Sequence, residues 1–404
     1  MRKKLWNKDF ILLLQGGAVS IIGDVMYGVA IGYWVYQKTG SSALMGIMSS
    51  ISMFVTMFLS PFCGSIVDKC NRKWLMVAID TIQGALMLTV GILAYFNQLN
   101  VPIVLIAALL AAFGSVFYSP ALSTLMLDLI PRDDMVRGQS IHSGIASAID
   151  LVGTAFSGAM VAFLGVPLIV VINGLSNLYS AASIMFINVP QTIQQGLQVS
   201  VKGVLTDSKK ALSIIFSDQF LKIFVPCVLI LNFLGAGPLT LILPFCMEKG
   251  FTVDMYGYFL SVYTSASFLC VALLGIVKFS PKARFWIMAL GFTLSVPCCA
   301  LCYCSAQYLP MCIAVFFAGF LNSAGNAVFN ASLMLALPKE NRGAILGFIR
   351  SASVGGVALS SLTYGLLGEI WPLYLVFTVG SAISLAPMLY MCFHKDAKKF
   401  ILEH

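Results

Sequence analysis

Charged residues are scarce in this chain of 404 residues: Asp, Glu, Lys and Arg together make up 10% of it, whereas 59% is hydrophobic. Soluble domains carry about 25% charged residues, so this chain lacks the polar surface that water requires on every side. The composition therefore excludes an ordinary soluble enzyme, a nucleic-acid-binding module and a secreted disulfide scaffold.

Several chemical signatures are missing as well. The chain has three histidines, one of them in the ending Leu402–His404, which we interpret as a tag remnant. We find no catalytic constellation and predict no enzyme activity and no catalytic residue. No glycine-rich loop is followed by Lys and Ser or Thr, which argues against ATP as an energy source. The eleven cysteines lie almost entirely in apolar segments and need no disulfide framework. We predict no metal site and no cofactor.

Long apolar runs dominate what is present. A membrane-spanning helix takes roughly 20 apolar residues, so twelve would occupy about 240 positions, close to the apolar share of the chain. Turn residues divide these runs into six spans, a polar stretch over 188–218, and six more spans. We predict an all-α membrane protein with six-helix bundles over 1–187 and 219–401. The predicted spans are 10–37, 44–67, 74–96, 101–127, 139–163, 167–187, 219–247, 254–277, 284–306, 308–335, 343–367 and 370–393.

The distribution of basic residues predicts the orientation. The chain has 24 Lys and Arg against 16 Asp and Glu, a net charge of +8. With the predicted spans, nearly all of the basic residues fall on one side, and only Lys38 and Lys249 fall on the other. Cytoplasmic loops are normally the basic ones, so we expect both termini and the central loop in the cytoplasm. The positive charge thus needs no nucleic acid or other anionic partner.

The two halves contain a weak internal repeat. Arg137-Gly138 corresponds to Arg342-Gly343, and Pro167-Leu168 corresponds to Pro372-Leu373 at the same spacing. Two six-helix halves related by an axis along the membrane normal enclose a site near the midplane, which rocking exposes to each side in turn. The repeat therefore predicts alternating access.

The connection between the second and third spans carries a family motif. It reads Gly-Ser-Ile-Val-Asp-Lys-Cys-Asn-Arg-Lys from Gly64 to Lys73, which resembles the major facilitator superfamily. The chain departs from the family pattern at Asn71, where Gly is usual. Asn tolerates a left-handed backbone well, so we expect the turn to be kept. The resemblance implies a conformational gate of Gly64, Asp68, Arg72 and Lys73, in which Asp68 meets the start of the eleventh span near Gly343.

Five further short motifs are Ile22–Asp24, Asn71–Lys73, Ser119–Leu122, Pro131–Asp134 and Leu243–Phe245. They resemble the bacterial branch that contains macrolide-efflux proteins and the enterobactin exporter, a likeness that implies a bacterial plasma membrane. The glycines of the fifth span resemble an antiporter signature only loosely, because Thr154 stands where that signature has Pro.

Two carboxylates lie near the middle of predicted spans, Asp24 in the first and Asp150 in the fifth. Ionisable groups at this depth are costly and point to function. Buried carboxylates bind protons at higher pH than exposed ones, so we predict that Asp24 and Asp150 couple transport to protons. The alternative is a structural network with a buried Arg or amide. Asp80 in the third span is expected to tie that helix to the nearby basic loop. The sequence leaves open whether Arg350 and His142 take part.

Neutral polar residues suggest where a substrate binds. Asn322, Asn326 and Asn330 recur every four residues and so share one helical face. The family resemblance implies that this span lines the cavity together with the first, fourth and seventh spans. Hydrogen bonding between helices is the alternative use of the stripe. The full set of predicted substrate-binding residues is Asn322, Asn326, Asn330, Asn232, Gln15, Tyr27, Tyr118 and Phe233.

These observations predict a monomeric secondary transporter in the lipid bilayer that exports amphipathic or lipophilic compounds in exchange for protons, with sodium as the alternative coupling ion. Two alternatives keep the fold: an exporter of a siderophore or other metabolite, and a metal-ion transporter with Asp24 as ligand. A third is a membrane receptor or scaffold that transports nothing.

Overall fold

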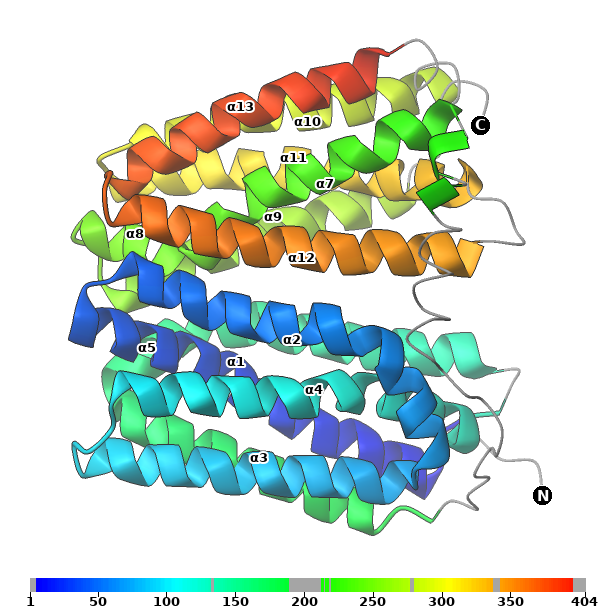
Figure 1. Ribbon diagram of the computed structural model, residues 1–404, viewed down its shortest axis with the longest axis vertical. Helices are drawn as coiled ribbons and strands as arrows, with labels where there is room; N and C mark the ends of the chain where they lie inside the picture. The colour runs from blue at the N-terminus through cyan, green and yellow to red at the C-terminus, as the bar shows by residue number, and fades with distance from the viewer. Residues whose placement is uncertain are drawn as a thin grey trace. The chain divides into compact units, whose positions relative to one another are not determined.

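The computed structural model describes residues 5–131, 134–188, 212–213, 215–217, 219–276, 280–336 and 342–394. Within these ranges the regular structure is helical and contains no strand (Figure 1). The helices are α1 (Lys8–Thr39), α2 (Ser42–Lys69), α3 (Arg72–Tyr95), α4 (Val101–Leu129), α5 (Met135–Met185), α7 (Gln219–Thr240), α8 (Ile242–Glu248), α9 (Val253–Ile276), α10 (Pro281–Cys304), α11 (Tyr308–Ala336), α12 (Arg342–Gly368) and α13 (Leu373–Phe393).

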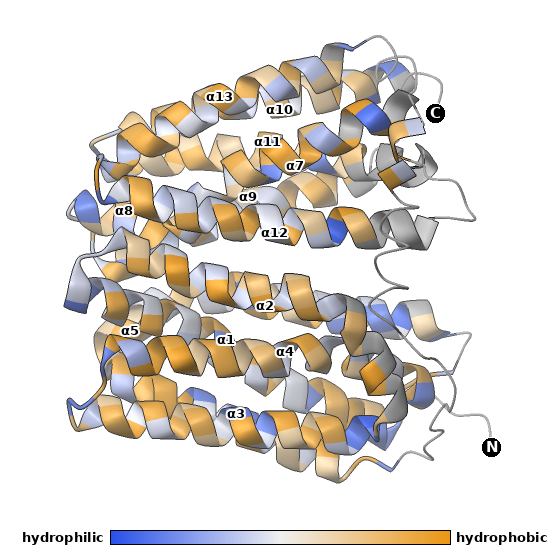
Figure 2. Ribbon diagram, viewed as in Figure 1, coloured by the Kyte–Doolittle hydropathy of each residue, from blue (hydrophilic) through white to orange (hydrophobic). Residues whose placement is uncertain are grey.

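Ten helices in the described part of the chain are long and apolar enough to cross a membrane. One of them, α5, has 51 residues and a break at Gly165, where φ is 74° and ψ is 160°. Only glycine adopts this conformation readily, and Pro167 follows, so α5 supplies two spans. Apolar residues predominate along helices such as α4 and α13 (Figure 2). The all-α membrane architecture is confirmed, and the helices fall close to the predicted segments.

Polar side chains mark several helix starts. The side chains of Asn7, Asn71, Asn100 and Ser280 each accept a hydrogen bond from a backbone N–H in the first turn of the following helix. The expectation of a left-handed Asn71 is wrong: its φ of −71° and ψ of 103° are extended. Asn71 instead caps α3 by accepting from Trp74 N at 3.0 Å. The side chain thus has a use that glycine in the family motif cannot supply.

The chain divides into two compact units. Unit 1 comprises Met1–Gly40, Ile51–Val199 and Val253–Tyr258, and unit 2 comprises Ser41–Ser50, Ser200–Thr252 and Phe259–His404. Most of the predicted linker over 188–218 and the ending 402–404 lie outside the described residues. The boundaries of the predicted bundles therefore stay predictions.

In unit 1, α1 and α3 pack against α5, and α3 also packs against α4. Phe10, Met76, Leu125 and Ile184 come from these four helices and are each at most 1% exposed, which places the core between them. Gly23 of α1 lies directly against α5, where an added Cβ would meet Ser176 Oγ and would stand 3.2 Å from Asn173 Cα. Glycine is therefore what lets these two helices approach each other.

In unit 2, α10 packs against α11 and α13, and α7 packs against α12 and α13. Pro238 lies inside α7 and has no N–H for the carbonyl of Leu234. The hydroxyl of Tyr364 on α12 donates to this carbonyl at 2.8 Å. The Tyr364 ring itself fits against Gly237 of α7 and Gly380 of α13, where side chains would collide with it. One side chain thus holds three helices of unit 2 together.

Unit 2 also includes the first turns of α2, which pack on the end of α12. Glu369 Oε1 accepts from Ala43 N at 2.9 Å and from the Ser41 hydroxyl at 2.7 Å. The Ser50 hydroxyl donates to Ala358 O at 2.7 Å. The Ala43 N–H, followed by the Ser41 hydroxyl, holds the pKa of Glu369 below its ordinary value. The carboxylate therefore acts as a cap at the start of α2.

We expect Glu369→Gln to lower the thermal unfolding temperature of the purified protein at neutral pH. A lowered pKa means that the ionised carboxylate stabilises the fold above its ordinary pKa, and that this contribution is lost as pH falls through the lowered value. Glu369 is exposed, so we expect an effect of about 1 kcal/mol or less. Wild type and variant should converge at an acidic pH below the lowered pKa of Glu369. A difference that is equal at both pH values would contradict the assignment.

Candidate functional site

Unit 2 contains a cavity of about 520 Å³, lined by residues of α7, α8, α9, α10, α11, α12 and α13. This volume lies within the range of small-molecule pockets, roughly 300–1,000 Å³. The residues that line it are mainly aliphatic and aromatic, with a few neutral polar groups and none that is charged in the described part of the chain. Such a wall suits an apolar molecule that carries a small number of hydrogen-bonding groups.

Three of the predicted asparagines lie at this cavity: Asn232 on α7, and Asn322 and Asn326 on α11. Asn326 Nδ2 donates to Asn322 Oδ1 at 2.8 Å and to Asn322 O at 3.0 Å. Asn232 Nδ2 donates to Val228 O at 3.0 Å and to Ser353 Oγ at 3.4 Å. The side-chain amides of Asn326 and Asn232 are thus each oriented by a hydrogen bond to the residue four positions earlier on the same helix. The side chain of Asn330 lies outside the described residues.

The cavity also contains residues that the sequence reasoning missed. Tyr263, Tyr303 and Phe292 add an aromatic wall, and Ser381 and Ser384 of α13 add hydroxyl groups. Tyr303 packs edge to face with Phe245 at 5.7 Å between ring centroids. Isolated Ser and Tyr residues are frequent in this chain, and no spacing distinguishes these from packing residues. Only the tertiary arrangement of the surrounding helices identifies them.

In unit 1, a network of polar side chains surrounds Asp24. Asn173 Nδ2 donates to Asp24 Oδ1 at 3.2 Å, Asn177 Nδ2 donates to Asn173 Oδ1 at 2.5 Å, and the Ser20 hydroxyl lies 3.4 Å from Asn177 Oδ1. Asn173 and Asn177 are 1% and 2% exposed, whereas Asp24 is accessible. A buried amide pair therefore orients an accessible carboxylate. The sequence reasoning missed both amides, although Asn173 and Asn177 have the same four-residue spacing as the stripe that it identified.

The other predicted residues are distributed unevenly. Tyr27 and Tyr118 both interact electrostatically with Asp24, so the structure brings these three together. Gln15 and Asp150 are exposed in unit 1, and no contact that we describe joins them to this group. Phe233 is half-buried on α7 but is not among the residues that line the cavity. The predicted substrate residues thus do not form one site: three asparagines line the cavity of unit 2, Tyr27 and Tyr118 lie near Asp24 in unit 1, and, among the contacts that the structure describes, Gln15 and Phe233 belong to neither place.

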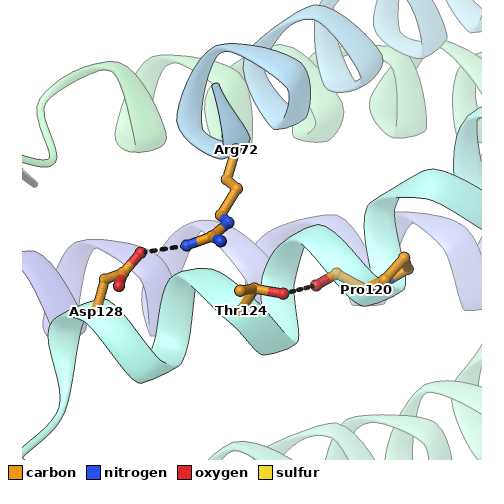
Figure 3. A network of polar contacts seen from close by, with 4 residues as sticks. All are labelled: Arg72, Pro120, Thr124 and Asp128. Atoms are coloured by element: carbon orange, nitrogen blue, oxygen red, sulfur yellow. Dashed lines mark hydrogen bonds and ion pairs between the residues drawn. The ribbon is translucent and has the colours of Figure 1, made fainter. Parts of the chain in front are cut away.

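Arg72, predicted as part of the gate, forms an ion pair with Asp128 of α4 (Figure 3). Its Nη1 lies 2.9 Å from Asp128 Oδ2, and the two side chains are 10% and 26% exposed. Lys73 Nζ lies 5.4 Å from the centre of the Trp74 ring. The surroundings of Gly64, Asp68 and Gly343 lie outside what the structure describes. In unit 1, therefore, this segment fastens α3 to the end of α4.

Comparison with known proteins gives a family match over most of the chain. The family model described as Major Facilitator Superfamily matches residues 13–277 and 227–399. Macrolide efflux protein A of Streptococcus pyogenes is 24% identical over 186 residues, which are 46% of this chain and 46% of that protein. Multidrug efflux pump Tap of Mycobacterium bovis is 28% identical over 160 residues, 38% of each chain. The matched region thus spans less than half the length of these relatives.

Two solved structures show the same fold. The nucleoside transporter NupG has a TM-score of 0.73 with 12% identity, over 98% of this chain and 99% of that one. A bacterial homologue of the human lysosomal transporter Spinster, in an inward-facing and unoccupied conformation, has a TM-score of 0.68 with 14% identity, over 98% and 95%. At these identities the likeness concerns the fold alone.

Proposed function

Because this chain belongs to the major facilitator superfamily, we propose that it is a proton-coupled exporter of amphipathic or lipophilic organic compounds. The family and its structural neighbours are membrane transporters, and the chain has the multi-pass architecture that transport requires. The efflux names of its relatives favour export over uptake. As a transporter, the protein moves a small molecule without altering it chemically.

The proposed substrate class is based on the cavity of unit 2. Its described wall joins apolar and aromatic side chains to neutral amides and hydroxyls, without a charged group. Burying an apolar ligand surface in such a wall is favourable by about 25 cal/mol per Å². A polar group of the ligand would hydrogen-bond to Asn232, Asn322 or Asn326. We expect neutral or weakly basic organic molecules to fit this wall better than small inorganic ions.

We propose coupling to protons because of the position of Asp24. Its carboxylate is accessible and is oriented by Asn173 within a span, so it could gain a proton on one side of the membrane and lose it on the other. Asp150, exposed on α5, is retained as a second candidate. Sodium in place of the proton is the alternative, which an imposed sodium gradient would distinguish.

We further propose that the protein is a monomer in a bacterial plasma membrane, with both termini in the cytoplasm. The distribution of basic residues supports this orientation, and the bacterial relatives support this membrane. Asp68 is proposed to hold the start of α12 in the outward-facing state, with Gly64, Arg72 and Lys73 as its supporting segment. A helix start attracts a carboxylate because its unpaired N–H groups carry partial positive charge.

The proposed function is tested in liposomes that contain the purified protein and an imposed pH gradient, with the macrolide erythromycin as probe. We expect gradient-driven transport by the wild type, and at least a tenfold loss in the double variant Asn322→Leu, Asn326→Leu. Two lost hydrogen bonds of about 1 kcal/mol each correspond to this factor or more. Ser323→Ala changes a neighbouring polar residue of α11 that does not line the cavity and serves as control.

Two results would contradict the proposal. Absence of both gradient-driven transport and erythromycin counterflow in the wild type would count against efflux of this compound class. Unchanged transport in the double variant would show that the cavity of unit 2 does not bind the probe.

A further inference from the structure

A second carboxylate, Asp80, is buried in unit 1 close to Asp24. Asp80 lies on α3, eight residues beyond Arg72 and therefore about 12 Å along the helix. It is 2% exposed. The expected tie between Asp80 and the basic loop is wrong, because Arg72 pairs with Asp128 and Asp80 forms no ion pair in the part of the chain that the structure describes. A buried acid without a cation needs another explanation.

Two polar atoms at this place lack hydrogen bonds. Asp80 Oδ2 and Ser180 Oγ are both fully buried and have no hydrogen-bond partner within the described residues. Ser180 of α5 and Tyr118 of α4 nevertheless interact with the Asp80 carboxyl. The three groups are therefore neighbours whose geometry falls short of a hydrogen bond to Oδ2. An unpaired buried polar atom costs free energy of about 1–3 kcal/mol. The two unpaired atoms in these membrane spans therefore indicate a functional role for Asp80.

The chemistry of the neighbours suits a carboxyl that changes its protonation state. A serine hydroxyl can donate to a carboxylate and can equally accept from a carboxylic acid, and a tyrosine hydroxyl can do the same. The hydroxyls of Ser180 and Tyr118 do not hold Asp80 in its ionised form, whereas a neighbouring Arg or Lys would. An ionised carboxylate without a cation is expensive in a low-dielectric interior, and the same group becomes tolerable when it binds a proton.

Asp80 and Asp24 are near enough for their charges to interact, although they belong to different helices. Asp80 interacts with Asp24, and Tyr118 interacts with both carboxyl groups. The titratable groups that face Asp80 are Asp24 from α1 and Tyr118 from α4, and Tyr27 of α1 faces Asp24. In the described residues, α5 adds neutral groups, namely Asn173, Asn177 and Ser180. Like charges so placed favour states in which the pair holds one proton.

We propose that Asp80 is a second proton site, which exchanges a proton with Asp24 inside unit 1 during each transport cycle. Asp24, the accessible member, receives and releases the proton, and Asp80, the sealed member, stores it. The Tyr118 hydroxyl interacts with both carboxyl groups, and it would accept a proton from one carboxyl as it gives its own to the other, which conserves protons and charge. This inference rests on the proposed proton coupling and adds a residue to it.

Infrared difference spectroscopy of the purified protein during a pH titration tests the proposal without any substrate. We expect the wild type to show a C=O stretching band of a carboxylic acid that titrates with pH, and Asp80→Asn to lose one titrating carboxyl. Asp24→Asn should keep the Asp80 band but move its titration midpoint, because the coupled charge is gone. A band that is unchanged in Asp80→Asn would overturn the proposal.

A stability control separates a proton site from a structural one. Asparagine has the shape of a neutral aspartic acid, so Asp80→Asn should unfold at a temperature close to that of the wild type. Ser180→Ala removes the neighbouring hydroxyl and should shift the Asp80 midpoint while the carboxyl remains. If Asp80→Asn does not fold, an unshifted midpoint in Ser180→Ala would overturn the proposal by itself.

Transport then reports on the coupling. In liposomes, the rate of pH-driven erythromycin transport should be at least tenfold lower in Asp80→Asn than in the wild type. Erythromycin counterflow should continue in this variant. If the wild type transports no erythromycin but the Asp80 band is present, the proposed function fails and the proton site stands. If the wild type transports erythromycin and Asp80→Asn keeps full antiport, the proton site fails and the proposed function stands.

Discussion

Asp24→Asn is expected to reduce pH-driven export of erythromycin at least tenfold while counterflow continues. Asparagine matches the size of aspartate and can still accept the hydrogen bond of Asn173, which measures 3.2 Å in the wild type. It cannot bind and release a proton, so only the coupling should be lost. Proton release during transport, followed with a pH-sensitive dye, provides the measurement.

Asp150→Asn belongs in the same experiment, because the exposed Asp150 is the second proposed coupling residue. Loss in both variants would assign coupling to both carboxylates, and loss in Asp24→Asn alone would assign it to Asp24. Full antiport in both variants would refute proton coupling through either group, and with it the role that the polar network of unit 1 has in the proposed mechanism.

Gly23→Val is expected to produce the largest loss of stability. Its side chain would collide with Ser176 Oγ and crowd the backbone of Asn173, which forces α1 away from α5. Overpacking at a tight contact costs about 1–3 kcal/mol, and separation of the two helices also breaks the hydrogen bond between Asn173 and Asp24. We expect a cost of about 3 kcal/mol or more, measured by unfolding of the detergent-purified protein.

Gly28→Val is the matched control, because it lies on the same helix and its added Cβ would meet nothing within 4 Å. Its unfolding should resemble that of the wild type. Equal destabilisation by the two substitutions would mean that a general effect of valine in α1 is responsible, and that the contact at Gly23 is not the cause.

The sequence predicted the spans well because their length is set by the thickness of a bilayer and their ends by short polar signals. Asn100 and Ser280 show this: each begins a helix with a side-chain cap at the start of a predicted span. The break at Gly165 was also predictable, since Gly and Pro occur together between two apolar runs. These features depend on residues that are close in sequence.

The candidate site was predictable only in part. The spacing of Asn322 and Asn326 is a local pattern, and both residues do line the cavity. The position of Asp80 is not local, because its neighbours come from α1, α4 and α5. Sequence reasoning paired it with the nearest basic residues along the chain, whereas the buried Arg72 is already occupied by Asp128. Partners of buried charges are decided by packing, and no sequence period reveals them.

The hydrogen bond from the Tyr364 hydroxyl to the Leu234 carbonyl limits how α7 can move. Proline weakens a helix at one point and so creates a joint, but here a side chain of α12 occupies the carbonyl that the joint exposes. Bending α7 there requires α12 to travel with it. Any opening of the neighbouring pocket by this joint would therefore be a concerted displacement of two helices, and loss of the phenolic oxygen would let one bend independently of the other.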